Sequence, residues 1–151
     1  MLKRSVSAEI LLVLFLSILT GLIYNTFSGN GIPIFYHSLG STPDQQLTLP
    51  QLQQAIADKR ALLIDARTSE EYTAGHLPDA IHIPGFAAID QIMNAMKDIS
   101  KDRQIIVYCS NVDCPFAVRI AEFLRFQEFT SVYVFSGGTD EWIGAGNSLI
   151  K

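Results

Sequence analysis

Four short apolar runs along the chain alternate with segments in which apolar residues recur at helical spacing. The runs cover residues 61–66, 80–85, 104–109 and 131–135, and their continuous apolar character is typical of strands buried on both faces. The helices between them are expected to begin near Thr48, at Ser69, after Phe86, at Pro115 and near Asp140. This alternation predicts an α/β fold in which helices cover both faces of a mainly parallel sheet.

Local signals support the positions of these helices. Thr48 and Gln51 fit a capping box, and Ser69 with the two glutamates after it fits a second helix start that ends at Gly75. Between residues 86 and 99, five apolar side chains share helical spacing and are expected to pack in the core: Phe86, Ile89, Ile92, Met93 and Met96.

The most apolar segment lies outside this alternation, at the N-terminus. Lys3 and Arg4 precede about 17 mostly apolar residues, from Ile10 to Thr26, which is near the shortest length that crosses a bilayer as a helix. A cleaved signal peptide is the alternative, with a weak cleavage site around Phe27. We expect an uncleaved transmembrane anchor, with the following domain exported to the periplasmic or extracytoplasmic side.

The rest of the chain provides a linker and one domain. Residues 28–46 are rich in Gly, Pro and Ser and are expected to link the anchor, residues 1–27, to a domain at 47–151. The chain has 151 residues, a length that allows one hydrophobic core, and its net charge is −4. No basic patch is visible, so nucleic acid is not an expected partner, whereas the membrane is one through the N-terminal helix.

Both cysteines lie where the strand at 104–109 passes into the helix that starts at Pro115. In a parallel sheet, reactive groups gather at the carboxyl ends of the strands, and Cys109 lies at such an end. Backbone amides of the loop and the positive end of the helix would favour the thiolate form of Cys109 and make it a nucleophile.

Other roles for the two cysteines stay open. Cys109 could be a small buried apolar residue of its strand, or it could form a structural disulfide with Cys114 that persists in an oxidising compartment. A metal site is not expected, because the two cysteines and one histidine supply at most three ligands and no C-x-x-C pair is present.

Three segments in order carry more specific information. They are LLIDARTSEEYTAGHLPDAIHIPG (62–85), IIVYCSNVDCPFAVRIAEFL (105–124) and VYVFSGGTDEWIGAG (132–146). Together they resemble the rhodanese-like domain, the fold of single-domain sulfurtransferases, over about residues 47–147. The resemblance implies a three-layer α/β domain whose mainly parallel sheet has about five strands.

The resemblance also implies an activity and a site. Such domains take sulfane sulfur from a small donor as a cysteine persulfide and pass it to a thiol acceptor, without a cofactor. Cys109 would then be the nucleophile, and Asp65 and Arg67 would support the loop. The amides that bind the substrate would be those of Ser110, Asn111, Val112, Asp113 and Cys114.

The chain departs from the family pattern at several positions. Family members carry a basic residue five positions after the cysteine and a glycine in mid-loop, where this chain has Cys114 and Val112. The missing charge weakens the case for an anionic donor such as thiosulfate. Related phosphatases have an arginine where this chain has Pro115, so phosphate chemistry is not expected. Glu128 replaces a helix-ending glycine, at a cost of about 1 kcal/mol if its backbone is left-handed.

Three functions follow from these observations. The first is a membrane-anchored sulfurtransferase, in which Cys114 resolves the persulfide on Cys109 to a disulfide. The second is a thiol–disulfide redox protein or sensor that uses the same cysteine pair with a redox protein partner. The third is a non-catalytic binding module of the same fold.

Overall fold

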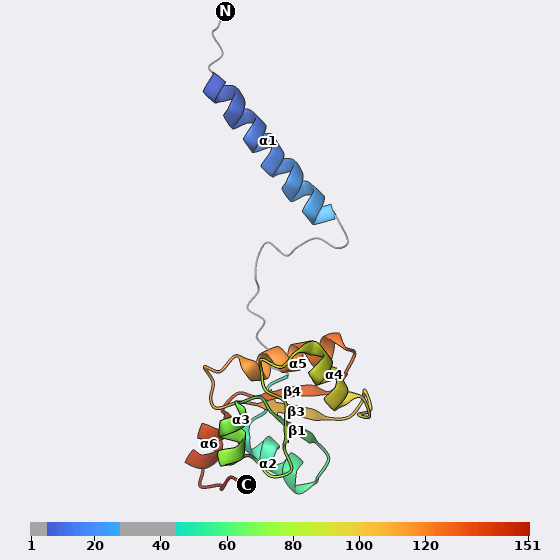
Figure 1. Cartoon of the computed structure of the whole chain (residues 1–151), viewed down its shortest axis with the longest axis vertical. Helices are drawn as coiled ribbons and strands as arrows, with labels where there is room; N and C mark the ends of the chain where they lie inside the picture. Colours follow the sequence, from blue (N-terminus) through green and yellow to red (C-terminus); the bar gives the residue numbers. More distant parts are fainter. Residues whose placement is uncertain (1–5, 28–44) are drawn as a thin grey trace, which may run out of the picture. The chain divides into compact units, whose positions relative to one another are not determined.

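The computed structural model describes residues 6–27 and 45–151 (Figure 1). The chain forms two compact units, Met1–His37 and Ser38–Lys151. The described part of the first unit is helix α1 (Val6–Phe27), which carries exposed apolar side chains. Within residues 6–27 and 45–151, no helix combines the length and apolar character that crossing a membrane requires, so the expected transmembrane helix is not supported. Nearly all of the expected linker, residues 28–46, lies outside the described residues.

A parallel sheet of four strands forms the centre of the second unit. The strands are β1 (Leu62–Asp65), β2 (Ile81–His82), β3 (Ile105–Tyr108) and β4 (Val132–Phe135), in the order β2-β1-β3-β4. The register aligns Asp65 with Tyr108 and Tyr108 with Phe135. Three strands therefore end at the same edge of the sheet, and Cys109 directly follows the central one.

The expected number of about five strands is wrong for the described residues. Where a further strand could lie along β4, Gln46 forms a single bridge to Val134, and the Leu47 amide donates to the Val134 carbonyl at 2.9 Å. The chain then enters a helix at Leu49, so the described residues before that helix, 45–48, form this bridge and no longer strand.

Helices cover both faces of the sheet and give three layers (Figure 1). They are α2 (Leu49–Ala57), α3 (Ser69–Ala74), α4 (Ile89–Met96), α5 (Phe116–Phe126) and α6 (Gly138–Gly144). Buried residues of α4 and α5 pack with Ile105 and Val107 on one face, and those of α2 and α6 pack with Ile106 and Tyr108 on the other. The expected α/β architecture with a parallel sheet between helices is confirmed.

The helix starts follow the expected capping patterns with one shift. Gln51 Oε1 accepts a hydrogen bond from the Thr48 amide at 2.9 Å, which confirms the predicted pairing at the start of α2. The N-cap of α3 is Thr68, not Ser69, because the Thr68 hydroxyl accepts from the Glu71 amide at 3.3 Å. Thr68 and Glu71 thus fix the start of α3.

The predicted core of the segment at residues 86–99 is only partly correct. Ile92 and Met96 are buried, but Phe86 and Ile89 are 60% and 63% exposed. The helix begins only at Ile89, so Phe86 lies before it and does not share the buried face. Helical spacing alone did not reveal where the helix starts.

The end of α5 explains the residue at position 128. Glu128 has a φ of +66°, its amide donates to the Arg125 carbonyl at 2.9 Å, and the Phe129 amide donates to the Leu124 carbonyl at 3.1 Å. These two bonds form a Schellman motif, which places the residue after the C-cap in the left-handed region. The left-handed conformation considered for Glu128 is therefore present.

Candidate functional site

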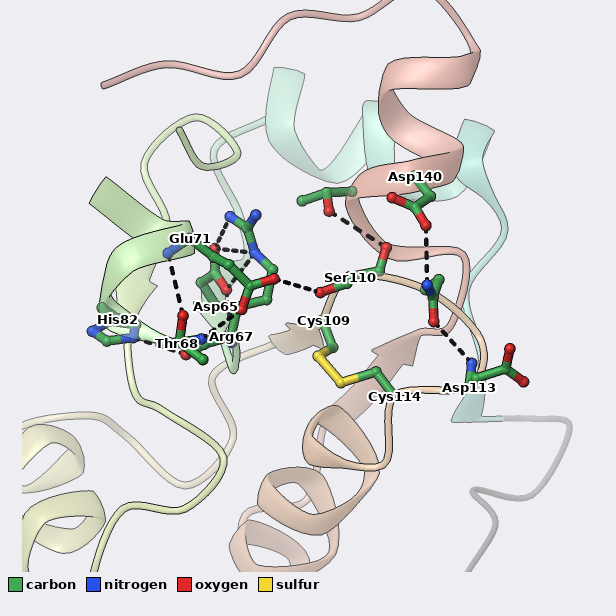
Figure 2. Close-up of a disulfide and its surroundings, with 12 residues drawn as sticks. Asp65, Arg67, Thr68, Glu71, His82, Cys109, Ser110, Asp113, Cys114 and Asp140 are labelled. Atoms are coloured by element: carbon green, nitrogen blue, oxygen red, sulfur yellow. Dashed lines mark hydrogen bonds and ion pairs between the residues drawn. A yellow bond between two sulfur atoms is a disulfide. The ribbon is translucent and has the colours of Figure 1, made fainter. Parts of the chain in front are cut away.

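The two cysteines lie at either end of the loop that joins β3 to α5. They form a disulfide with their Cα atoms 6.2 Å apart (Figure 2). Cys109 is buried, with 3% of its surface exposed, whereas Cys114 is half-buried at the outer end of the loop. A reagent in solution therefore meets Cys114 more readily than Cys109.

The backbone amides of the loop differ in their hydrogen bonding. The Asn111 side-chain oxygen accepts from the Asp113 amide at 3.2 Å, and its carbonyl accepts from the Cys114 amide at 3.2 Å. The amides of Ser110, Asn111 and Val112 donate to no described residue. Of the five amides predicted to bind a substrate, these three can still donate a hydrogen bond to it. The amides of Asp113 and Cys114 already donate to Asn111.

The start of α6 anchors the first half of the loop. The Thr139 amide donates to the Cys109 carbonyl and the Asp140 amide donates to the Ser110 carbonyl, each at 3.0 Å. This approach requires Gly138, which has a φ of +59° and whose missing Cβ would lie 2.4 Å from the Cys109 carbonyl oxygen. The Asn111 side chain donates to the Asp140 carboxylate at 3.0 Å (Figure 2).

Glu71 of α3 anchors the loop from the other side. Its Oε1 accepts from the Ser110 hydroxyl and its Oε2 from the Thr68 amide, both at 3.0 Å (Figure 2). The Thr68 amide, together with the Ser110 hydroxyl, outweighs the effect of burial and lowers the pKa of Glu71, so the side chain is a carboxylate at neutral pH. In the sequence, Glu71 stands out only as one of the two glutamates at a helix start, and no local signal points to its contact with the loop.

Asp65 and Arg67 lie next to the loop in a buried network. Arg67 Nη2 donates to Asp65 at 2.6 Å and to the Gly75 carbonyl at 2.7 Å, and the Tyr108 hydroxyl donates to Asp65 at 2.7 Å. Burial and the neighbouring Asp65 charge raise the pKa of Tyr108 well above its usual range. Arg67 is 5% exposed and is occupied by these partners, so it holds the strand ends in place and does not face the sulfur atoms.

The charged side chains that contact the loop are carboxylates. Glu71 bonds to Ser110, Asp140 bonds to Asn111, and Asp113 is part of the loop itself. No lysine, arginine or histidine side chain hydrogen-bonds to the loop within the described part of the chain, and Arg119, one turn into α5, donates instead to the Gly85 carbonyl. Across residues 6–27 and 45–151, no group of three or more His, Cys, Asp or Glu side chains could hold a metal ion.

The fold and the site together define the class of this protein, a parallel α/β domain with a cysteine directly after β3, one of its two inner strands, in a loop that leads into a helix. Within that class, residues 48–145 match the family model of the rhodanese-like domain. The chain belongs to this family.

Named relatives differ in their functions. The chain is 29% identical over 93 residues to the thiosulfate sulfurtransferase GlpE of Pseudomonas savastanoi pv. phaseolicola, which covers 62% of this chain and 82% of that protein. It is 38% identical over 86 residues to the HTH-type transcriptional regulator Rv0324 of Mycobacterium tuberculosis, but this match covers 55% of the chain and only 36% of the regulator. The crystal structure of the BH2092 protein from Bacillus halodurans superposes with a TM-score of 0.63 at 26% identity, over 70% of this chain and 75% of that one.

Proposed function

We propose that the domain is a sulfurtransferase that carries sulfane sulfur as a persulfide on Cys109, with Cys114 as the resolving thiol. The observation that carries this proposal is the position of Cys109 after β3, next to the three amides of Ser110, Asn111 and Val112, which have no partner among the described residues. Amide donors of this kind stabilise a sulfur anion. The similarity to a thiosulfate sulfurtransferase supports the same reaction class.

The proposed reaction starts from the reduced loop. The Cys109 thiolate attacks the outer sulfur of a donor such as thiosulfate, the donor S–S bond breaks, and sulfite leaves with the electron pair. The persulfide on Cys109 then passes its outer sulfur to an acceptor thiolate. In a second route, the Cys114 thiol attacks the inner sulfur of the persulfide, which forms the Cys109–Cys114 disulfide and releases hydrosulfide.

A thiol–disulfide redox protein is the second candidate, favoured by the disulfide itself and by the absence of a basic side chain in the loop. In this candidate, the cysteine pair exchanges two electrons with a partner dithiol and carries no sulfur. The non-catalytic binding module has no comparable support, because a buried Cys109 beside open amides is more than such a module needs.

Intact mass of the full chain separates these candidates. The reduced protein is treated with thiosulfate, and separately with a neutral polysulfide, alongside Cys109→Ser and Cys114→Ser. We expect a gain of one sulfur atom in Cys114→Ser, which lacks the resolving thiol, and none in Cys109→Ser. In the unmodified chain the added sulfur should be lost as hydrosulfide when Cys114 forms the disulfide. No added sulfur on Cys114→Ser from either donor would contradict the sulfurtransferase and favour the redox protein.

We also propose that the domain functions on the extracytoplasmic side, in an oxidising compartment. The basic residues before the apolar N-terminal segment and a cysteine pair able to form a disulfide support this location. In whole cells that express the full chain, a membrane-impermeant maleimide added after brief reduction should label the cysteines. Labelling that occurs only after lysis would contradict the proposal.

A further inference from the structure

Release of hydrosulfide through Cys114 leaves the cysteine pair oxidised, so the loop then needs two electrons before it can accept sulfur again. We propose that a dithiol on a positively charged polypeptide supplies these electrons and that it attacks the disulfide at Cys114. The place of this step in a cycle rests on the proposed function, whereas the exchange reaction itself requires only the Cys109–Cys114 disulfide.

Accessibility favours attack at Cys114. Cys109 is 3% exposed, whereas Cys114 is half-buried and lies between the exposed residues Asp113 and Pro115. Attack at Cys114 also makes Cys109 the leaving group, beside the open amides of the loop. Because a better stabilised thiolate leaves faster, the loop geometry and the accessibility favour the same direction of attack.

The exchange balances in two steps. A thiolate of the polypeptide attacks Cys114 Sγ, a mixed disulfide forms, and the electron pair of the broken bond leaves on Cys109 Sγ. The second thiolate of the polypeptide then attacks the polypeptide's other sulfur, which is bonded to Cys114 in the mixed disulfide. Cys114 leaves as a thiolate. The polypeptide dithiol is oxidised to a disulfide, the loop is reduced, and the two protons of the dithiol pass to the released thiolates through solvent.

The charge around the loop selects the reductant. Glu71, Asp113 and Asp140 surround it, and Asp113 and Asp140 are exposed, without a cation bonded to the loop among the described residues. A carboxylate-bearing thiol is repelled by this rim, whereas a lysine-rich polypeptide is attracted and its encounter rate rises.

Exposed apolar side chains near Cys114 favour a polypeptide over a small thiol. Val112 in the loop is 75% exposed, and Phe86 is 60% exposed. The Phe86 ring packs edge-on against Phe116, two residues after Cys114, with centroids 6.5 Å apart. A peptide whose cysteine reaches Cys114 can therefore cover apolar surface with the residues beside its cysteine.

The test compares two dithiol peptides of equal length that differ only in flanking lysines or flanking glutamates. Second-order rates of reduction of the oxidised full chain are measured and corrected for each peptide's thiolate fraction. At low ionic strength we expect the lysine peptide to react at least about tenfold faster, with the ratio falling towards one as salt is added. Equal rates, or a faster glutamate peptide, would overturn the proposal.

Matched variants locate the effect. Asp113→Asn with Asp140→Asn should reduce the rate ratio, whereas Asp79→Asn with Asp98→Asn should leave it unchanged. The control pair removes the same charge, but Asp79 and Asp98 line a hollow beside Leu62, at the amino end of β1. Equal effects of the two pairs would mean that net charge alone sets the rate, which contradicts a role for the loop rim.

A lysine peptide with a single cysteine identifies the attacked sulfur, because its mixed disulfide accumulates. After acid quenching and alkylation, peptide mapping should find the adduct on Cys114, and an adduct on Cys109 would overturn that assignment. If Cys114→Ser gains no sulfur from any donor, the sulfurtransferase proposal fails, yet the exchange rates of the unmodified chain can still support this inference, so the two failures are distinguishable.

Discussion

Replacing Asp65 by asparagine removes a charge from the buried network beside the loop and changes little of its shape. The Asp65 oxygens accept from the Arg67 backbone amide at 2.9 Å, from its guanidinium at 2.6 Å and from the Tyr108 hydroxyl at 2.7 Å. An asparagine has one acceptor oxygen, so at least one donor meets its NH₂ group and Arg67 loses its counter-charge. Breaking a buried ion pair costs about 3–5 kcal/mol, and we expect Asp65→Asn to lower the free energy of unfolding by that amount.

Urea unfolding followed by circular dichroism measures this loss, with linear extrapolation to water. Asp58→Asn is a matched control, because Asp58 pairs with Arg60 at the same sequence separation of two residues. The side chains of Arg60 and Asp58 are 70% and 30% exposed, and ion pairs in water contribute little. The control should therefore unfold at nearly the same urea concentration as the unmodified chain.

Tyr108→Phe provides an independent check on the same network. The Tyr108 hydroxyl donates to Asp65 and accepts from the Leu77 amide at 3.1 Å, so its removal should cost about 1–3 kcal/mol. The double variant with Asp65→Asn should lose less than the sum of the single losses, because the two groups share a bond. A loss in Asp65→Asn no larger than in Asp58→Asn, or strict additivity, would refute the reasoning.

Three further predictions use other single substitutions. Glu128→Gly relieves a left-handed backbone at φ +66° and should raise the free energy of unfolding in urea by up to about 1 kcal/mol; no gain would contradict the strain. Gly138→Ala places a Cβ 2.4 Å from the Cys109 carbonyl oxygen and should lower the free energy of unfolding by at least about 1–3 kcal/mol. Gly144→Ala in the same helix, where a Cβ would meet nothing within 4 Å, should show no loss from a clash. A backbone amide and a hydroxyl lower the pKa of Glu71 in the folded protein below its ordinary value of 4.5. The ionised side chain therefore stabilises the fold fully above pH 4.5, and this stabilisation is lost as the pH falls through the lower pKa of the folded state. Glu71→Gln should flatten the acid side of the plot of unfolding free energy against pH.

The strands and the position of Cys109 were predictable because both depend on local sequence. Three strands lie within short, mainly apolar runs, whereas β2 covers only Ile81 and His82 of the run at 80–85. A residue that directly follows a parallel strand must lie at the carboxyl edge of the sheet. The contacts that anchor the loop were not predictable, because Glu71 and Ser110 are 39 residues apart and nothing local to either one specifies the other. The exposed positions of Phe86 and Ile89 were missed for a related reason, since helical spacing does not define the first residue of a helix.

The anchors are distributed unevenly along the loop, and this distribution bears on both proposed chemistries. The Cys109 and Ser110 carbonyls bond to α6 and the Ser110 hydroxyl bonds to Glu71, so the first half of the loop is fixed by two other elements of the fold. Asp113 and Cys114 are held by Asn111 of the same loop and by the disulfide. Reduction therefore removes a constraint from Cys114 while the backbone of Cys109 stays anchored. A persulfide on Cys109 needs a fixed nucleophile with room beside it for one more sulfur atom. Thiol–disulfide exchange needs an accessible sulfur at Cys114. Movement of Cys114 with a fixed Cys109 therefore suits both reactions.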